Sequence, residues 1–73
     1  MTVQSDLQKA IAQCQSLLGT YQVSASATQD QVAKKMFQEL GQDIQRHIDH
    51  LNNRLSYLEK NNPMYQQQQQ APL

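Results

Sequence analysis

Four polar side chains in the second half of the chain have the residue types and the spacing of a metal site. Glu39, Asp43, His47 and His50 follow one another at steps of three or four residues, which places them on one flank of a helix. Imidazole nitrogens and carboxylate oxygens are common ligands of transition metals. Asp43, His47 and His50 are therefore candidate ligands of a metal or small-ligand carrier. The alternative, which we favour, is a polar helix surface that binds no metal.

Other chemistry has less support in the residue types. The chain has no Glu-x-x-His motif, and a di-iron bundle needs inward-pointing acids where this chain places apolar residues. The only cysteine, Cys14, lies within an apolar stripe, so we expect a small buried side chain rather than a reactive thiol. No spacing of Ser, His and acid supports a catalytic triad, and there is no Gly-rich phosphate loop. We expect neither enzyme activity nor a cofactor.

The apolar residues on either side of Gln29 are arranged as mirror images, as a chain folded back on itself requires. The numbers of the paired residues add up to 58: Ala25 and Ala33, Tyr21 and Phe37, Leu18 and Leu40, Cys14 and Ile44, Ala10 and Ile48, Leu7 and Leu51, Val3 and Leu55. The sequence therefore predicts an all-α fold, an antiparallel two-helix hairpin with helices over about 3–26 and 29–61. A single unbroken helix is the alternative, because neither Pro nor Gly interrupts residues 23–28.

Helix-capping residues mark the start of each predicted helix. Thr2 and Ser5 are candidate N-caps of the first helix, and Ser5 with Gln8 has the spacing of a capping box. Thr28 with Gln31 repeats that spacing, so the second helix should begin between Thr28 and Asp30.

Each predicted helix carries an apolar stripe. In the first helix the stripe contains Val3, Leu7, Ala10, Cys14, Leu17 and Tyr21, widened by Ile11, Leu18 and Ala25, and the opposite polar face carries Gln4, Gln8, Gln15, Gln22 and Gly19. In the second helix it contains Ala33, Phe37, Leu40, Ile44, Ile48, Leu51, Leu55 and Leu58. Gly41 should face Leu17, where it would allow a close helix approach. The helical hairpin is expected to occupy residues 1–62, and the Gln-rich tail, residues 63–73, is expected to be disordered.

A second, partly apolar strip lies beside the stripe of the second helix. It contains Val32, Met36, His47, Arg54 and Tyr57. Two helices cover only one side of each other, so this strip stays in water unless another chain covers it. We predict a homodimer in which two hairpins form a four-helix bundle through this interface. A hairpin monomer docked on another protein is the competing arrangement.

Composition restricts the partners further. The 73 residues include six basic and six acidic side chains, so the formal net charge is zero and a nucleic-acid partner is not expected. The first ten residues lack the features of a signal peptide, and no stretch is long and apolar enough to insert into a bilayer. A soluble, cytoplasmic protein is the expectation.

A family resemblance rests on residues spread along most of the chain. These are Met1-Thr2-Val3, Thr20-Tyr21, Ala27-Thr28-Gln29-Asp30, Ala33-Lys34, Phe37, Gln45, Ile48-Asp49, Leu51, Arg54, Leu58-Glu59, Pro63 and Tyr65. In this pattern the chain resembles a small helical family, a domain of unknown function from spore-forming Firmicutes, typically encoded near stage V sporulation membrane-channel proteins. The matching positions are mostly structural, so the resemblance transfers no catalytic residues.

The resemblance implies a role in spore formation, resistance or germination, through protein contacts in the spore core or at the spore inner membrane, with a spore membrane protein as a possible partner. Together with the residue pattern, it predicts a non-enzymatic helical interaction or structural module. The alternative hypothesis is the carrier built on a four-helix bundle with His47 and His50. A helical packing protein of the spore coat is a third hypothesis.

Overall fold

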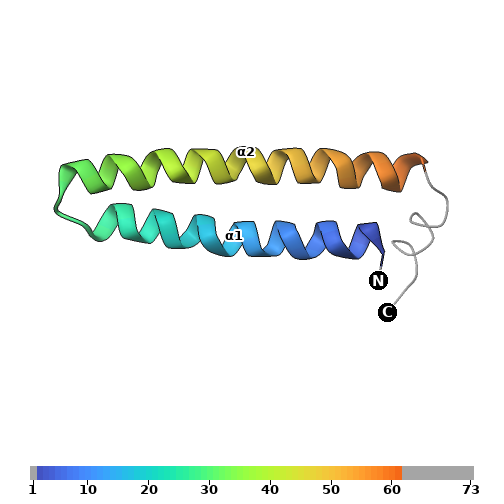
Figure 1. The fold of residues 1–73 in the computed structure, drawn as a ribbon, viewed down its shortest axis with the longest axis horizontal. Helices are drawn as coiled ribbons and strands as arrows, with labels where there is room; N and C mark the ends of the chain where they lie inside the picture. The colour runs from blue at the N-terminus through green and yellow to red at the C-terminus, as the bar shows by residue number, and fades with distance from the viewer. Residues whose placement is uncertain (1, 62–73) are drawn as a thin grey trace.

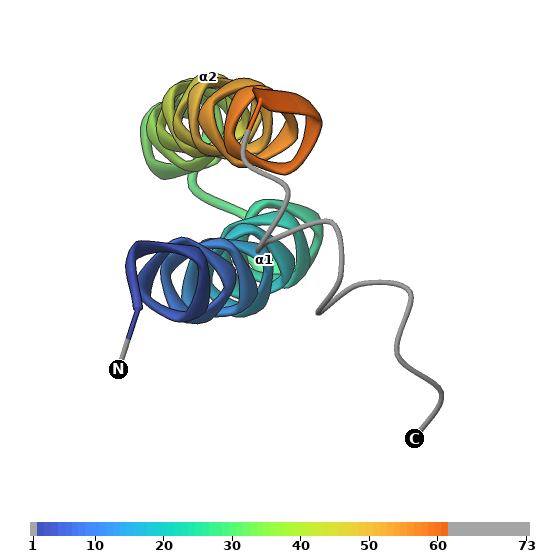
Figure 2. The ribbon, with the colours of Figure 1, turned by 90° about the vertical axis from the view of Figure 1, so that its right-hand side faces the viewer.

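Two antiparallel helices form the fold. The computed structural model describes residues 2–61, and these contain helices α1 (Val3–Ala27) and α2 (Gln31–Asn61) and no strand. The helices lie side by side and are joined by a short connection at one end (Figure 1), and the end-on view in Figure 2 shows one helix resting on the other. The all-α hairpin predicted from the mirror-image pattern is confirmed, and the alternative of one unbroken helix is wrong. The predicted tail, residues 63–73, lies outside the described residues.

Thr2 caps the start of α1. Its side-chain oxygen accepts a hydrogen bond from the backbone N–H of Ser5 at 3.0 Å, and its carbonyl accepts the first helical bond, from Asp6. Ser5 lies inside the first turn of the helix, so the candidate capping box of Ser5 and Gln8 does not form the helix start. Of the two candidate caps, Thr2 is the one in use.

Asp30, rather than Thr28, caps α2. The Asp30 carboxylate accepts from the N–H groups of Val32 and Ala33 at 2.9 and 3.3 Å. Thr28 has extended backbone angles and ends α1, and its hydroxyl accepts from the N–H of Asp30 at 3.2 Å. Because the chain needs the three residues 28–30 to reverse direction, α2 begins at Gln31, slightly later than the sequence pattern predicted.

The helices pack along a seam whose positions alternate by three and four residues, as in antiparallel coiled coils. The buried or half-buried residues of this α1–α2 seam are Gln4, Leu7, Ile11, Cys14, Leu18, Tyr21 and Ala25 on α1, and Phe37, Gly41, Ile44, Ile48, Leu51, Leu55 and Leu58 on α2. No side chain among the described residues is completely buried. The hairpin therefore has a thin core that its own two helices do not close.

The seam runs along one edge of the predicted α1 stripe. As a result, the burial of three α1 residues differs from the prediction. Val3 and Leu17, predicted to be core residues, are 54% and 38% exposed, whereas Gln4, predicted to be on the polar face, is 5% exposed. The Gln4 amide donates to the Glu59 carboxylate at 3.4 Å. The apolar stripe of α1 is wider than one facing helix can cover. Packing is centred on Ile11, Leu18 and Ala25, so Val3 and Leu17 at the far edge stay in solvent.

The mirror-image pairing holds near the connection. The rings of Tyr21 and Phe37, one of the predicted pairs, lie with centroids 6.2 Å apart. Such a pair contributes about 0.5–1.5 kcal/mol beyond its burial. Gly41 faces Leu18 and Tyr21 instead of the predicted Leu17, because Leu17 lies outside the seam.

Candidate interaction surface

The two long sides of the hairpin differ in their side chains. One side has an open groove of about 610 Å³ between the helices. The residues that line it include Gln22 and Ser26 of α1 and Gln38, Gln42 and Gln45 of α2. Each residue of an α-helix is rotated by about 100° from the one before it, which places Gln22 at one edge of the α1 seam and Leu17 at the other. The groove therefore marks a glutamine side, and the opposite edges of both seams form the other side.

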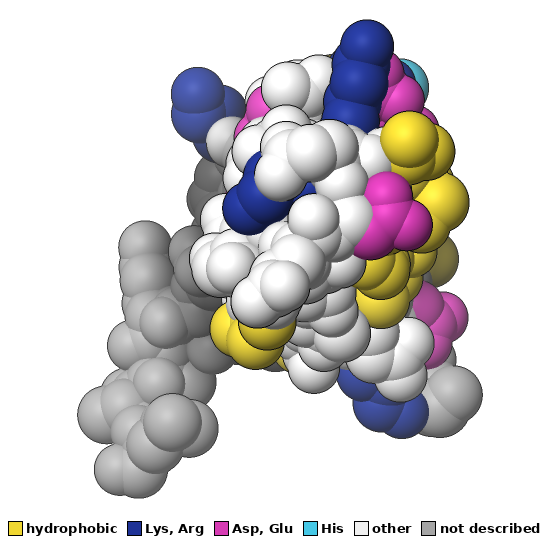
Figure 3. All heavy atoms as spheres, turned by 90° about the vertical axis from the view of Figure 1, so that its left-hand side faces the viewer, with side chains coloured by type: hydrophobic (Ala, Val, Ile, Leu, Met, Phe, Trp, Pro, Cys, Tyr) yellow, Lys and Arg dark blue, Asp and Glu magenta, His cyan; other side chains and the backbone are white. Residues whose placement is uncertain are grey.

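Large hydrophobic side chains are exposed on that other side. Leu17 and Val3 contribute from α1, and Val32, Met36 and Tyr57 contribute from α2, with Val32 80% and Met36 46% exposed. We call these five residues the apolar side. Seen from the end with the connection, hydrophobic side chains gather on the right-hand side of the molecule, while much of the remaining visible surface is uncharged and polar (Figure 3). An exposed apolar surface that extends over two elements is typical of a binding site.

Val23 provides a useful contrast to the apolar side. It is 68% exposed. However, it precedes Ala25 by two residues and so lies about 160° around α1 from that seam position. Val23 is a single exposed hydrophobic residue on the outer face of α1, which is a common feature of protein surfaces.

The predicted interface residues all lie exposed on α2. Val32, Met36, His47 and Arg54 occupy one flank of the helix, next to the seam with α1, and Tyr57 lies further round, at the outer edge of that flank. The Arg54 guanidinium lies 5.2 Å from the centre of the Tyr57 ring, which is a cation–π contact. Sequence reasoning found this flank on α2 but missed the α1 part of the apolar side. The α1 part of the apolar side could have been predicted from the width of the α1 stripe. That stripe extends around the helix from Leu17 to Ile11.

The candidate metal ligands do not converge on one point. Asp43 is paired with Arg46, one turn further along α2, rather than with His47. His47 and His50 line a shallow groove on α2 together with Arg46 and Leu51. Within residues 2–61 no group of three or more His, Cys, Asp or Glu side chains is placed to hold a metal ion.

Cys14 is half-buried in the α1–α2 seam, as predicted for a small packing residue. Its neighbours along the seam of α1 are Ile11 and Leu18, one turn away on either side. These are apolar side chains, and apolar surroundings do not activate a thiol.

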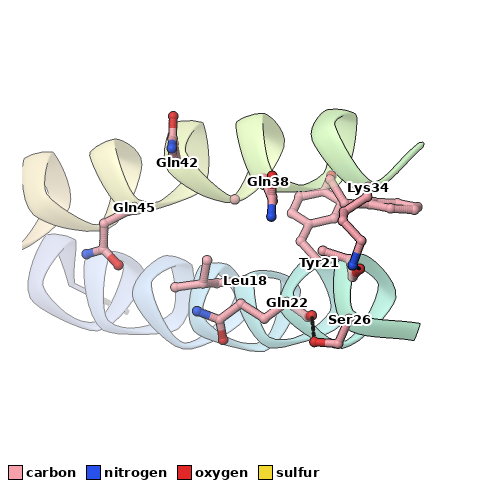
Figure 4. Close-up of a pocket in the computed structure, with 11 residues that line it drawn as sticks. Leu18, Tyr21, Gln22, Ser26, Lys34, Gln38, Gln42 and Gln45 are labelled. Atoms are coloured by element: carbon pink, nitrogen blue, oxygen red, sulfur yellow. Dashed lines mark hydrogen bonds between the residues drawn. The ribbon is translucent and has the colours of Figure 1, made fainter. Parts of the chain in front are cut away.

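The groove on the glutamine side has an apolar floor and an amide rim. Leu18 and Tyr21 point from α1 toward α2, while Gln38 and Gln45 reach down from α2 and Gln42 points away from α1 (Figure 4). At the end near the connection, the Lys34 ammonium donates to the carbonyl of Ala25 at 2.7 Å. That carbonyl belongs to the last turn of α1, so Lys34 closes the C-terminal end of that helix.

A family model described as "Protein of unknown function (DUF1657)" matches residues 7–55, which is more than half of the chain. No match was found among curated proteins, and none among solved structures. Among the described residues, neither helix has an apolar stretch sufficient to cross a membrane.

Proposed function

Because the chain belongs to the DUF1657 family, whose description assigns no function, we propose a function from the residues of this structure: a non-enzymatic helical module that binds another protein chain through its apolar side. The single observation that carries this proposal is the unequal distribution of exposed hydrophobic residues. Leu17 and Met36 flank the seam on the apolar side, and the opposite edges carry glutamine amides.

Burial energetics support this proposal. Each large apolar side chain that moves from water into a packed interface contributes about 1.5–3 kcal/mol. The hairpin has a thin core, with Ile11, Ala25 and Ile48 as its buried hydrophobic residues. A partner on the apolar side would extend this core across both helices. Binding would then stabilise the fold, because a ligand that binds only the folded state shifts the folding equilibrium.

Site-specific photo-cross-linking in the cell of origin tests the proposal. A photoreactive amino acid is placed at Met36 on the apolar side and, as the matched control, at Val23 on the outer face of α1; both positions are exposed. We expect cross-linked protein adducts from position 36 and none above background from position 23. Equal yields at the two positions, or no adduct at either, would refute the module function. The mass of the adduct also distinguishes a second copy of the chain from a different protein.

We also propose that the module acts in sporulating cells, in spore resistance or germination. The support is the resemblance carried by residues such as Ala27-Thr28-Gln29-Asp30 and Ile48-Asp49. An immunoblot through sporulation, followed by fractionation of the spores, tests this assignment. Accumulation in the developing spore, in its core or its inner membrane fraction, is expected, and a constant level during growth with none in spores would contradict it. Accumulation in the coat fraction would favour the packing-protein hypothesis instead.

A further inference from the structure

We propose that the chain that covers the apolar side is a second copy of this protein, with the two α2 helices antiparallel about a two-fold axis between Arg46 and His47. This inference rests on the proposed function and names its partner and register. A two-fold axis requires each residue of one copy to meet a defined residue of the other, so the contact surface of α2 must be self-complementary.

The part of α2 that would form this contact is a second stripe beside the seam with α1. It contains Val32, Met36, Asp43, His47, His50, Arg54 and Tyr57, at steps of three, four or seven residues. Glu39 lies at its outer edge. Each of these residues is exposed except Asp43, which is half-exposed. The stripe is apolar at both ends and polar between them, and it has the spacing of a second coiled-coil contact surface.

Three pairs of residues on this stripe are complementary in one register. In this register, the numbers of two residues that face each other across the dimer add up to 93. Met36 then meets Tyr57, Glu39 meets Arg54, and Asp43 meets His50. The first pair is apolar and places a thioether against an aromatic ring, a favourable contact. The other two pairs each join an acidic residue with a basic residue, and each pair occurs twice by symmetry.

The parallel arrangement lacks this complementarity. In a parallel two-fold dimer each residue of the stripe faces its own copy, so Glu39 would meet Glu39 and Arg54 would meet Arg54. Like charges placed opposite one another oppose association, and charge patterning of this kind sets orientation in helical dimers. In the antiparallel register Arg46 lies next to the axis, where Asp43 of its own chain pairs with it. In this register Arg46 faces His47 of the second copy rather than the second Arg46, and Asp43 balances its charge.

Both helices of each hairpin take part in the assembly. Leu17 of α1 is exposed on the same side as Met36, so the joined hairpins bury a surface that extends from α2 onto α1. Two hairpins packed in this way form a four-helix bundle, in which each helix has two neighbours. The glutamine sides then face outward in both copies.

A charge-exchange experiment tests the register. Sedimentation equilibrium of the full chain measures the dimer dissociation constant for the wild type, Glu39→Arg, Arg54→Glu and the double variant, with circular dichroism to verify the helix content. Each single change places like charges opposite each other twice, and we expect dissociation constants raised about tenfold, with restoration in the double variant. Equal dissociation constants in all four proteins would overturn the antiparallel register.

Disulfide trapping provides an independent measurement, in a Cys14→Ala background so that the introduced cysteines are the only ones. In the antiparallel dimer, positions 36 of the two copies lie about 30 Å apart, at 1.5 Å per residue. A mixture of the Met36→Cys and Tyr57→Cys proteins should therefore form the mixed disulfide dimer, and Met36→Cys alone should not. Efficient cross-linking of Met36→Cys alone would overturn the register in favour of a parallel dimer.

The failures of the two proposals are distinguishable. A wild-type chain that stays monomeric at all concentrations would overturn the second-copy inference, yet photo-cross-linked adducts with a different protein at position 36 would uphold the interaction module. Loss of both the dimer and the adducts would overturn both proposals.

Discussion

The amide of Gln4 is buried at the open end of the α1–α2 seam, where it donates to the half-buried carboxylate of Glu59 at 3.4 Å. This contact is long for a hydrogen bond and contributes little. The position itself is a seam position, one turn before Leu7 and two turns before Ile11, where an apolar side chain would pack. The glutamine therefore sits where burial favours a hydrocarbon side chain.

We expect Gln4→Leu to raise the free energy of unfolding by about 1 kcal/mol, because it adds apolar burial and leaves Glu59 partly in contact with water. Urea denaturation followed by circular dichroism at one protein concentration measures the change. Gln8→Leu is the matched control, since Gln8 is exposed on the same helix and should change the value by less than about 0.5 kcal/mol. A lower stability for Gln4→Leu would mean that the amide contact matters more than burial.

The two glycines lie inside helices, and their surroundings differ. Gly19 of α1 has nothing within 4 Å of the position that a Cβ would take. Gly41 of α2 faces the other helix, with Leu18 Cδ1 at 3.5 Å and Tyr21 Cβ at 3.9 Å from that position. Both distances are ordinary van der Waals contacts, so the helices approach closely at Gly41 and still leave room for one methyl group.

Gly19→Ala and Gly41→Ala should each stabilise the protein by about 1 kcal/mol, which is the difference in helix propensity between Gly and Ala. Gly41→Leu should destabilise it, because a branched side chain would push α1 and α2 apart, whereas Gly19→Leu should not. Thermal unfolding of the four variants measures these effects. A loss of stability in Gly41→Ala would show that the helices need a closer approach there than the structure has.

The whole molecule has apolar residues both in the α1–α2 seam and exposed on the apolar side beside it, so covering that side would couple folding to association. Ile11, Ala25 and Ile48 are the buried hydrophobic residues of the hairpin, and Met36 and Leu17 remain exposed beside them. If a second copy covers the apolar side, the stability of the fold must depend on protein concentration, because the unfolded chains are monomers.

The melting temperature should rise by a few degrees for each tenfold increase in concentration, since a tenfold change corresponds to about 1.4 kcal/mol. Met36→Glu should remove this dependence, because it places a charge in the interface. Val23→Glu, an exposed position of similar residue type on the outer face of α1, should retain it. A melting temperature of the wild type that does not change with concentration would argue against self-association.

The sequence by itself determined the elements and their antiparallel arrangement. Helical periodicity is a local property of the chain, and the mirror-image spacing about Gln29 requires the chain to reverse there, as it does at residues 28–30. Spacing alone also predicted the pairing of Tyr21 with Phe37. It likewise predicted the flank of α2 on which Val32 and Met36 are exposed.

Only the tertiary structure decided which edge of the wide α1 stripe packs and which is left in solvent. That choice depends on how far α1 is rotated about its own axis relative to the seam residues of α2, such as Gly41 and Ile48. The helical repeat of the sequence does not specify this rotation. Packing buried Gln4 and exposed Leu17, the reverse of what residue type indicates. The apolar side on α1 became visible for the same reason: two helices share one seam, and the hydrophobic residues outside it remain in water.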